Sequence, residues 1–167
     1  MKRHLLAGRF GIDDILEIPI DTDEQKTDFQ LVDSKKSLDH GIGNALLDLK
    51  SLGIFPTEVG IDLLILAAHV HAADTRISRV SESQDSWTRE IRLVVPVSDP
   101  FLWSSAKDTL KTMLNFLTGD QWEIGFRARP KGFESISLKQ SERLLPLPFD
   151  SLSLFSGGLD SLIGAIN

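Results

Sequence analysis

The chain has 167 residues, of which 41% are hydrophobic and 25% are charged, and its formal net charge is −6 at pH 7. This composition is typical of a globular protein and excludes disordered and fibrous chains. The acidic balance disfavours a general nucleic-acid-binding surface. The chain contains no cysteine, which excludes disulfide bonds, thiolate zinc sites and cysteine nucleophiles within these residues. No apolar run is long enough to span a membrane, so we expect no membrane segment and a cytoplasmic location.

Two strands are predicted near the N-terminus. Residues 14–20 place Leu16, Ile18 and Ile20 on one face at a period of two, and the proline within this run suggests an edge strand. Residues 28–32 predict a second, short strand.

Two helices are predicted next. Apolar residues recur at helical spacing over 41–52, and Gly53 can end that helix. Thr57 is a suitable N-cap for the second helix, with Glu58 at the positive end of the helix dipole. This helix is apolar on nearly every face, so we expect it in the centre of the core.

The next segments alternate between polar and apolar residues. Residues 87–97 and 121–129 predict strands with one apolar face, which Arg89 interrupts in the first of them. A further strand is predicted at 133–138. The tryptophans of this part lie on amphipathic elements, so we expect core packing rather than base stacking for all three: Trp87, Trp103 and Trp122.

A helix is predicted between these strands. Asp99 is a suitable N-cap and Pro100 a favourable first residue. The apolar pattern runs to about Leu117, and Gly119 marks the end.

These elements predict an α+β domain over residues 1–147, with a mainly antiparallel sheet and helices on one face. The stretch 144–150 contains two prolines and is interpreted as a linker. Residues 148–167 are expected to begin a second domain.

The motif with the clearest chemistry lies between a predicted apolar strand at 151–155 and an apolar helix start. It consists of Ser156, Gly157, Gly158, Leu159, Asp160 and Ser161. A strand-to-helix turn directs free backbone N–H groups at one point, and two glycines let the backbone approach phosphate oxygens. Asp160 either orders the loop or faces a Mg²⁺ ion beside a polyphosphate. The alternative is a glycine-rich turn that only caps a helix.

This motif resembles the PP-loop of the N-type ATP pyrophosphatases, which include GMP, asparagine and argininosuccinate synthetases and 7-cyano-7-deazaguanine synthases. The resemblance implies a protein that uses ATP with Mg²⁺, splits ATP between the α- and β-phosphates, and adenylates a carbonyl or carboxyl oxygen. It implies that Ser156, Gly157, Gly158 and Ser161 bind phosphate, and that Asp160 shapes the loop or lies near Mg²⁺.

Residues 62–79 and 87–103 resemble the N-terminal domain of QueC-like proteins of the type found in Qat anti-phage defence systems. The resemblance implies a protein partner from the same system and a zinc cluster in a missing C-terminal part. A complete PP-loop domain needs many more residues than the 162–167 that follow the motif. We therefore expect an N-terminal fragment of such an enzyme, inactive alone, with no catalytic residue assignable here. The alternative is a non-catalytic domain that docks a partner protein.

A dense polar group suggests a recognition patch for a partner protein or an anionic ligand, because arginine suits carboxylate and phosphate. Its arginines are Arg76, Arg79, Arg89 and Arg92. The alternative is a solvated surface with internal ion pairs to Glu82, Asp85 and Glu90.

Two smaller groups are weaker candidates. Arg127, Arg129 and Lys131 either line the mouth of a nucleotide site or serve the structure. His69 and His71 point in different directions on a helix, so we expect structural or partner-facing roles and no metal ion.

Overall fold

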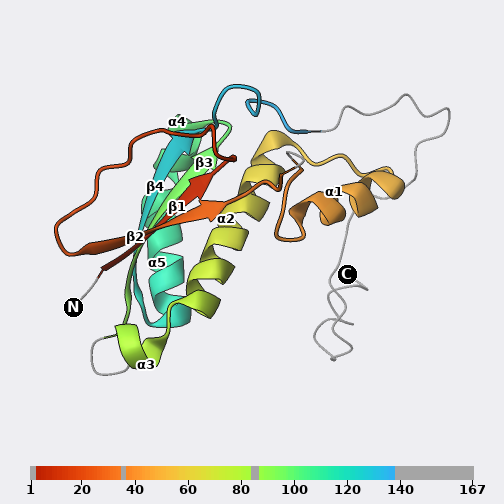
Figure 1. Ribbon diagram of the computed structural model, residues 1–167. Helices are drawn as coiled ribbons and strands as arrows, with labels where there is room; N and C mark the ends of the chain where they lie inside the picture. The colour runs from red at the N-terminus through yellow and green to blue at the C-terminus, as the bar shows by residue number, and fades with distance from the viewer. Residues whose placement is uncertain (1–2, 35–36, 84–86, 138–167) are drawn as a thin grey trace, which may run out of the picture.

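A four-stranded, wholly parallel sheet forms the centre of the structure (Figure 1). The computed structural model describes residues 3–34, 37–83 and 87–137. Its strands are β1 (Arg3–Arg9), β2 (Glu24–Gln30), β3 (Glu90–Val97) and β4 (Gln121–Ala128). Their spatial order is β2-β1-β3-β4, so β1 lies inside the sheet.

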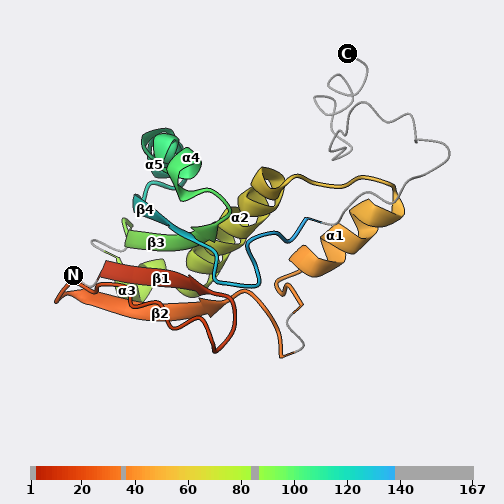
Figure 2. The same ribbon diagram turned by 90° about the horizontal axis from the view of Figure 1, so that it is seen from above.

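Five helices accompany the sheet in the described residues. They are α1 (Ile42–Ser51), α2 (Glu58–Arg76), α3 (Arg79–Glu82), α4 (Pro100–Ser105) and α5 (Lys107–Thr118). Figure 2 shows α1 lying away from the sheet and joined to α2 by a stretch of chain that is not helical. None of these helices is both long and apolar enough to cross a membrane.

Helix ends follow the predicted capping residues. The Thr57 hydroxyl accepts a hydrogen bond from the Gly60 amide at 3.3 Å, and the Asp99 carboxylate accepts from two amides at the start of α4. Gly119 adopts φ 72° after α5, a conformation that glycine takes without strain. The predicted boundaries near these residues are therefore confirmed.

The main core lies between one face of the sheet and helices α2, α4 and α5. One buried cluster contains Leu66, Trp103 and Leu114 of these helices. It also contains every second residue of β3, starting at Ile91. The prediction of helices on one face of the sheet is confirmed.

The opposite face carries a thinner cover. The segment 10–23, which joins β1 to β2 without a helix, packs Ile18 against Leu5 and Ala7 of β1. Farther along this face, Arg92 of β3 donates to both carboxylate oxygens of Glu24, at 2.8 and 3.0 Å. Ion pairs thus take the place of a second helical layer there.

The prediction of a mainly antiparallel sheet is wrong. Alternating polar and apolar residues are typical of antiparallel strands that have one solvated face. Here the same alternation arises in parallel strands, because the face without helices is filled by ion pairs such as Arg92–Glu24.

The predicted strand at 14–20 is also wrong. In the described residues this segment forms no strand, and Ile18 is buried while Leu16 and Ile20 are half exposed. The strand at the N-terminal end that was not predicted is β1. The charged residues at its two ends make it look like a surface segment in the sequence. Arg9 is buried because it donates to Asp28 at 2.9 Å and to the Leu16 carbonyl at 2.6 Å.

Other elements differ in detail. The helix expected from Pro100 to Leu117 is divided at Ala106 into α4 and α5. Residues 133–137 form no strand, and residue 138 lies outside the described residues. Trp103 and Trp122 are buried as predicted, but Trp87 precedes β3 and is largely exposed.

His69 is a fully buried, neutral histidine in the middle of α2. Its Nδ1 lies 2.7 Å from the Ile65 carbonyl, while Nε2 has no hydrogen-bond partner. Burial lowers the pKa of His69 to about 4. The ring packs so closely on β1 that a Cβ at Gly8 would overlap it and lie 2.5 Å from Pro96 Cδ.

This burial predicts an acid-sensitive core. The unfolded chain takes up a proton on His69 near pH 6.5 and the folded chain only near pH 4. The contribution of the neutral ring to the free energy of unfolding is therefore complete above pH 6.5. It declines by on the order of 3 kcal/mol as the pH falls toward 4. Urea unfolding at pH 7, 5.5 and 4 measures this decline.

The matched variants are His69→Gln and His71→Gln, the second on an exposed position of the same helix. His69→Gln should lower stability at pH 7 but flatten its pH dependence, and His71→Gln should leave that dependence unchanged. An equally steep decline in His69→Gln would show that other groups cause the acid sensitivity.

Candidate functional site

The PP-loop motif, residues 156–161, lies outside the described residues, as do the expected linker and the start of the second domain. The four arginines of the predicted recognition patch are described. Their surroundings show which of them could meet a ligand.

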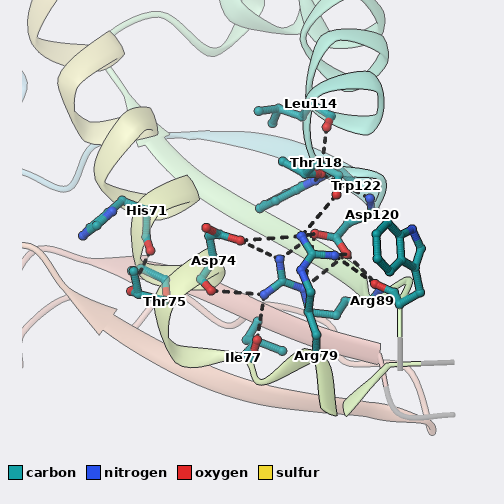
Figure 3. Close-up of polar contacts among 12 residues, drawn as sticks. His71, Asp74, Thr75, Ile77, Arg79, Arg89, Leu114, Thr118, Asp120 and Trp122 are labelled. Carbon is teal, nitrogen blue, oxygen red and sulfur yellow. Dashed lines mark hydrogen bonds and ion pairs between the residues drawn. The ribbon is translucent and has the colours of Figure 1, made fainter. Parts of the chain in front are cut away.

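Arg79 and Arg89 meet at the end of the sheet where β3 and β4 begin, on the carboxylate of Asp120 (Figure 3). Arg89 donates to Asp120 at 2.6 Å and to Asp74 at 2.7 Å, and Arg79 donates to both oxygens of Asp120 at 2.8 and 2.9 Å. The remaining Arg89 donors reach the carbonyls of Asp74 and Ile77. We call Asp74, Arg79, Arg89 and Asp120 the Asp120 cluster.

The electrostatics of the Asp120 cluster favour ionised groups. Burial alone would raise the pKa of Asp120, but hydrogen bonds from Arg89 and the charge of Arg79 hold it below its usual value. Burial likewise opposes the charge of Arg89, whereas Asp120 and Asp74 raise its pKa. Arg89 is 1% exposed, so its guanidinium joins the ends of α2, β3 and α5 rather than facing a ligand.

The other two arginines of the predicted patch lie elsewhere. Arg92 pairs with Glu24 on the face of the sheet without helices, and Arg76 lies over the Phe29 ring at 5.5 Å. Three of the four guanidinium groups therefore have carboxylate partners within the chain. In the part of the chain that the structure describes, these partners are Asp21, Glu24, Asp74 and Asp120, not the predicted Glu82 and Glu90. The third predicted partner, Asp85, lies outside the described residues.

We predict that Asp120→Asn destabilises the fold by about 3 kcal/mol, because it leaves the buried charge of Arg89 without its main partner. The free energy of unfolding in urea at pH 7 measures the effect. Asp23→Asn, at an exposed turn, is the control and should change stability by less than about 0.5 kcal/mol. Equal effects of the two substitutions would contradict a structural role for the Asp120 cluster.

The opposite end of the sheet holds two more buried ion pairs. Arg127 donates to Asp14 and to the Gly8 carbonyl, and Arg129 donates to Asp62. Asp62 also accepts from the indole N–H of Trp103 at 2.9 Å and from Ser98. Arg127 and Arg129 are thus enclosed, and their charges serve the structure at this end rather than an open nucleotide site.

Glu58, at the start of α2, anchors the chain that crosses this end of the sheet. Its carboxylate accepts hydrogen bonds at 2.8 Å from the Ser135 hydroxyl and from the amides of Ile136 and Ser137, and it also pairs with Arg129. Burial alone would raise the pKa of Glu58, but these hydrogen bonds lower it to about 2. The path of the chain up to Ser137 is therefore fixed by one carboxylate.

A cavity of about 710 Å³ opens at this end, outside the carboxyl ends of β1, β2 and β4. Three segments line it, which are Phe10–Asp14, residues 30–34 and residues 130–133. This cavity was not predicted. One signal in the sequence was Gly11, two residues beyond the end of β1, which adopts φ 88° in a tight turn.

The described residues contain no group of three or more His, Asp or Glu side chains that could hold a metal ion. Comparisons of the chain with protein-family models, with curated proteins and with solved structures find no match.

Proposed function

We propose that this chain is the N-terminal part of a QueC-like PP-loop ATP pyrophosphatase, with residues 1–147 as an accessory domain and 148–167 as the start of the nucleotide-binding domain. The observation that carries the proposal is Ser-Gly-Gly-Leu-Asp-Ser at 156–161, between an apolar segment and an apolar helix start. The Qat defence role and the cytoplasmic location are part of the same proposal.

In the proposed reaction, a carbonyl or carboxyl oxygen of the acceptor attacks the α-phosphorus of ATP, and the bond to the β-phosphate breaks. Backbone N–H groups at Gly157 and Gly158 and the hydroxyls of Ser156 and Ser161 hold the pyrophosphate that leaves. A nitrogen nucleophile then attacks the adenylated carbon and displaces AMP. Mg²⁺ neutralises the charge of the phosphates when it is bound, with Asp160 near it or ordering the loop.

Glu58 holds Ser137, the last residue that the structure describes, at the start of α2. In this proposal the chain continues from there toward the PP-loop.

The test is the formation of AMP and pyrophosphate from ATP by the full natural gene product. We predict that Ser156→Ala and Asp160→Ala each lower the rate by about a hundredfold or more, since both weaken the hold on the leaving group. Ser153→Ala, in the neighbouring apolar segment, is the control and should retain the rate. Activity that survives both motif substitutions would refute the proposal.

A second candidate function is the docking of a partner protein, which the solvent side of α5 favours. Met113, Phe116 and Leu117 are spaced so that they share one face of the helix, and they are 45%, 88% and 67% exposed. Exposed apolar side chains gathered on one face are typical of interaction surfaces. The partner of this proposal is a protein of the same defence system.

Size-exclusion chromatography of the chain mixed with each purified protein encoded beside it tests this candidate. We predict a complex that Phe116→Glu weakens by about tenfold or more, because a charge would enter an apolar interface. Asn44→Glu, which adds the same charge on α1, should leave the complex intact. A complex equally insensitive to both would show that α5 is not the docking face.

A further inference from the structure

The cavity outside the carboxyl ends of β1, β2 and β4 has the position of a ligand site. In open parallel sheets, ligands bind at this end, near the point where the strand order reverses. Here the chain passes from β1 to β2 in one direction and from β3 to β4 in the other, so the order reverses beside β1. A cavity of about 710 Å³ is within the usual range for small organic ligands.

One wall of the cavity is aromatic. The rings of Phe10 and Phe133 both line it, 4.7 Å apart and inclined by 38° to each other. Phe10 is buried in the core, Phe133 is only partly buried, and Val32 and Pro130 extend the same wall. Aromatic rings attract a further ring in a tilted or offset arrangement. The wall therefore suits an aromatic ligand better than an aliphatic one.

Hydrogen bonds hold the two segments that carry these rings. The Phe10 amide donates to the buried carboxylate of Asp14 at 2.9 Å. The Phe133 amide closes a turn on the carbonyl three residues before it at 3.0 Å, and Glu58 fixes residues 135–137 directly beyond. The wall is thus in place before a ligand arrives, which lowers the entropic cost of binding.

The described charged residues around the cavity do not favour one sign of charge on a ligand. Asp13 and Lys131 both line it and are both exposed. Asp14 is paired with Arg127, and Asp33 accepts a backbone hydrogen bond at 2.9 Å. Recognition is therefore left to the aromatic wall.

We propose that the cavity binds a small aromatic compound, which is held by its ring rather than by a charge. The ring of the ligand lies against Phe10 and Phe133, and the apolar side chains of the wall cover its edge. An aliphatic compound of the same size makes the apolar contact but not the contact between rings. The proposal does not depend on the PP-loop or on ATP chemistry.

The test is a titration of the ¹⁵N-labelled chain with benzyl alcohol, followed by NMR. We expect saturable shifts at Gly11, Val32 and Phe133, with a dissociation constant on the order of 1 mM for a ligand of this size. Cyclohexylmethanol, which has the same hydroxyl group on a ring without π electrons, should bind about fivefold more weakly. Benzylamine and phenylacetate should bind within about threefold of benzyl alcohol, since salt screens the exposed charges at the cavity.

Variants locate the ring that the ligand meets. Phe133→Leu keeps an apolar side chain but removes the ring, so it should weaken benzyl alcohol binding by about fivefold. It should also abolish the preference for benzyl alcohol over cyclohexylmethanol. Phe101→Leu, at an exposed position of α4 outside the cavity lining, is the matched control and should leave binding unchanged.

Any of four results would overturn the proposal. They are the absence of saturable shifts around the cavity, equal affinity of the unaltered chain for the aromatic and the aliphatic alcohol, equal losses in Phe133→Leu and Phe101→Leu, and a preference of about tenfold or more for one charged probe. The comparison of the two alcohols needs no variant, so the test stands even where Phe133→Leu fails to fold. Ser156→Ala should leave benzyl alcohol binding intact, so failure of the PP-loop proposal and failure of this one are distinguishable.

Discussion

Parallel strands can be joined only by connections that return from one end of the sheet to the other, and this constraint determines the layout of the whole domain. The two long connections, which contain α1–α2 and α4–α5, cover one face and form the main core. The connection from β1 to β2 has no helix and covers the other face with a few residues around Ile18. All strands end on the same side, and the loops that follow β1, β2 and β4 line the cavity there.

Both ends of the sheet are closed by arginine–aspartate pairs that are largely buried. At the end where strands begin, Asp120 receives Arg89 and Arg79, and at the other end Asp62 receives Arg129. Burying charges is costly, so such pairs are stable only when nearly every donor is satisfied. In each cluster the arginine joins elements that are distant in sequence. The arginines of the predicted recognition patch that lie in these clusters are thus structural.

Sequence patterns were sufficient to predict the helix boundaries that depend on neighbouring residues. The caps at Thr57 and Asp99 and the end at Gly119 depend on residues within one helical turn, and the structure has them as predicted. Strand direction depends on pairing across the chain, which alternation does not encode, and this is why the sheet was predicted antiparallel. The strand β1 was missed because Arg9 reads as a surface residue, although partners beyond the strand satisfy it. The cavity depends on three separate loops, so no single segment could indicate it.

The central position of β1 affects how the domain can be assembled. Among the strands of this sheet β1 is synthesised first. One edge of it can pair as soon as β2 is made, but the other edge has to wait for β3, since residue 4 pairs with residue 91. During that interval the nascent chain carries an unpaired strand edge beside apolar residues such as Leu6, which is the kind of surface that aggregates. Pairing over such a long stretch of chain also makes folding slow. We therefore expect the nascent domain to be most prone to aggregation between the synthesis of β1 and that of β3.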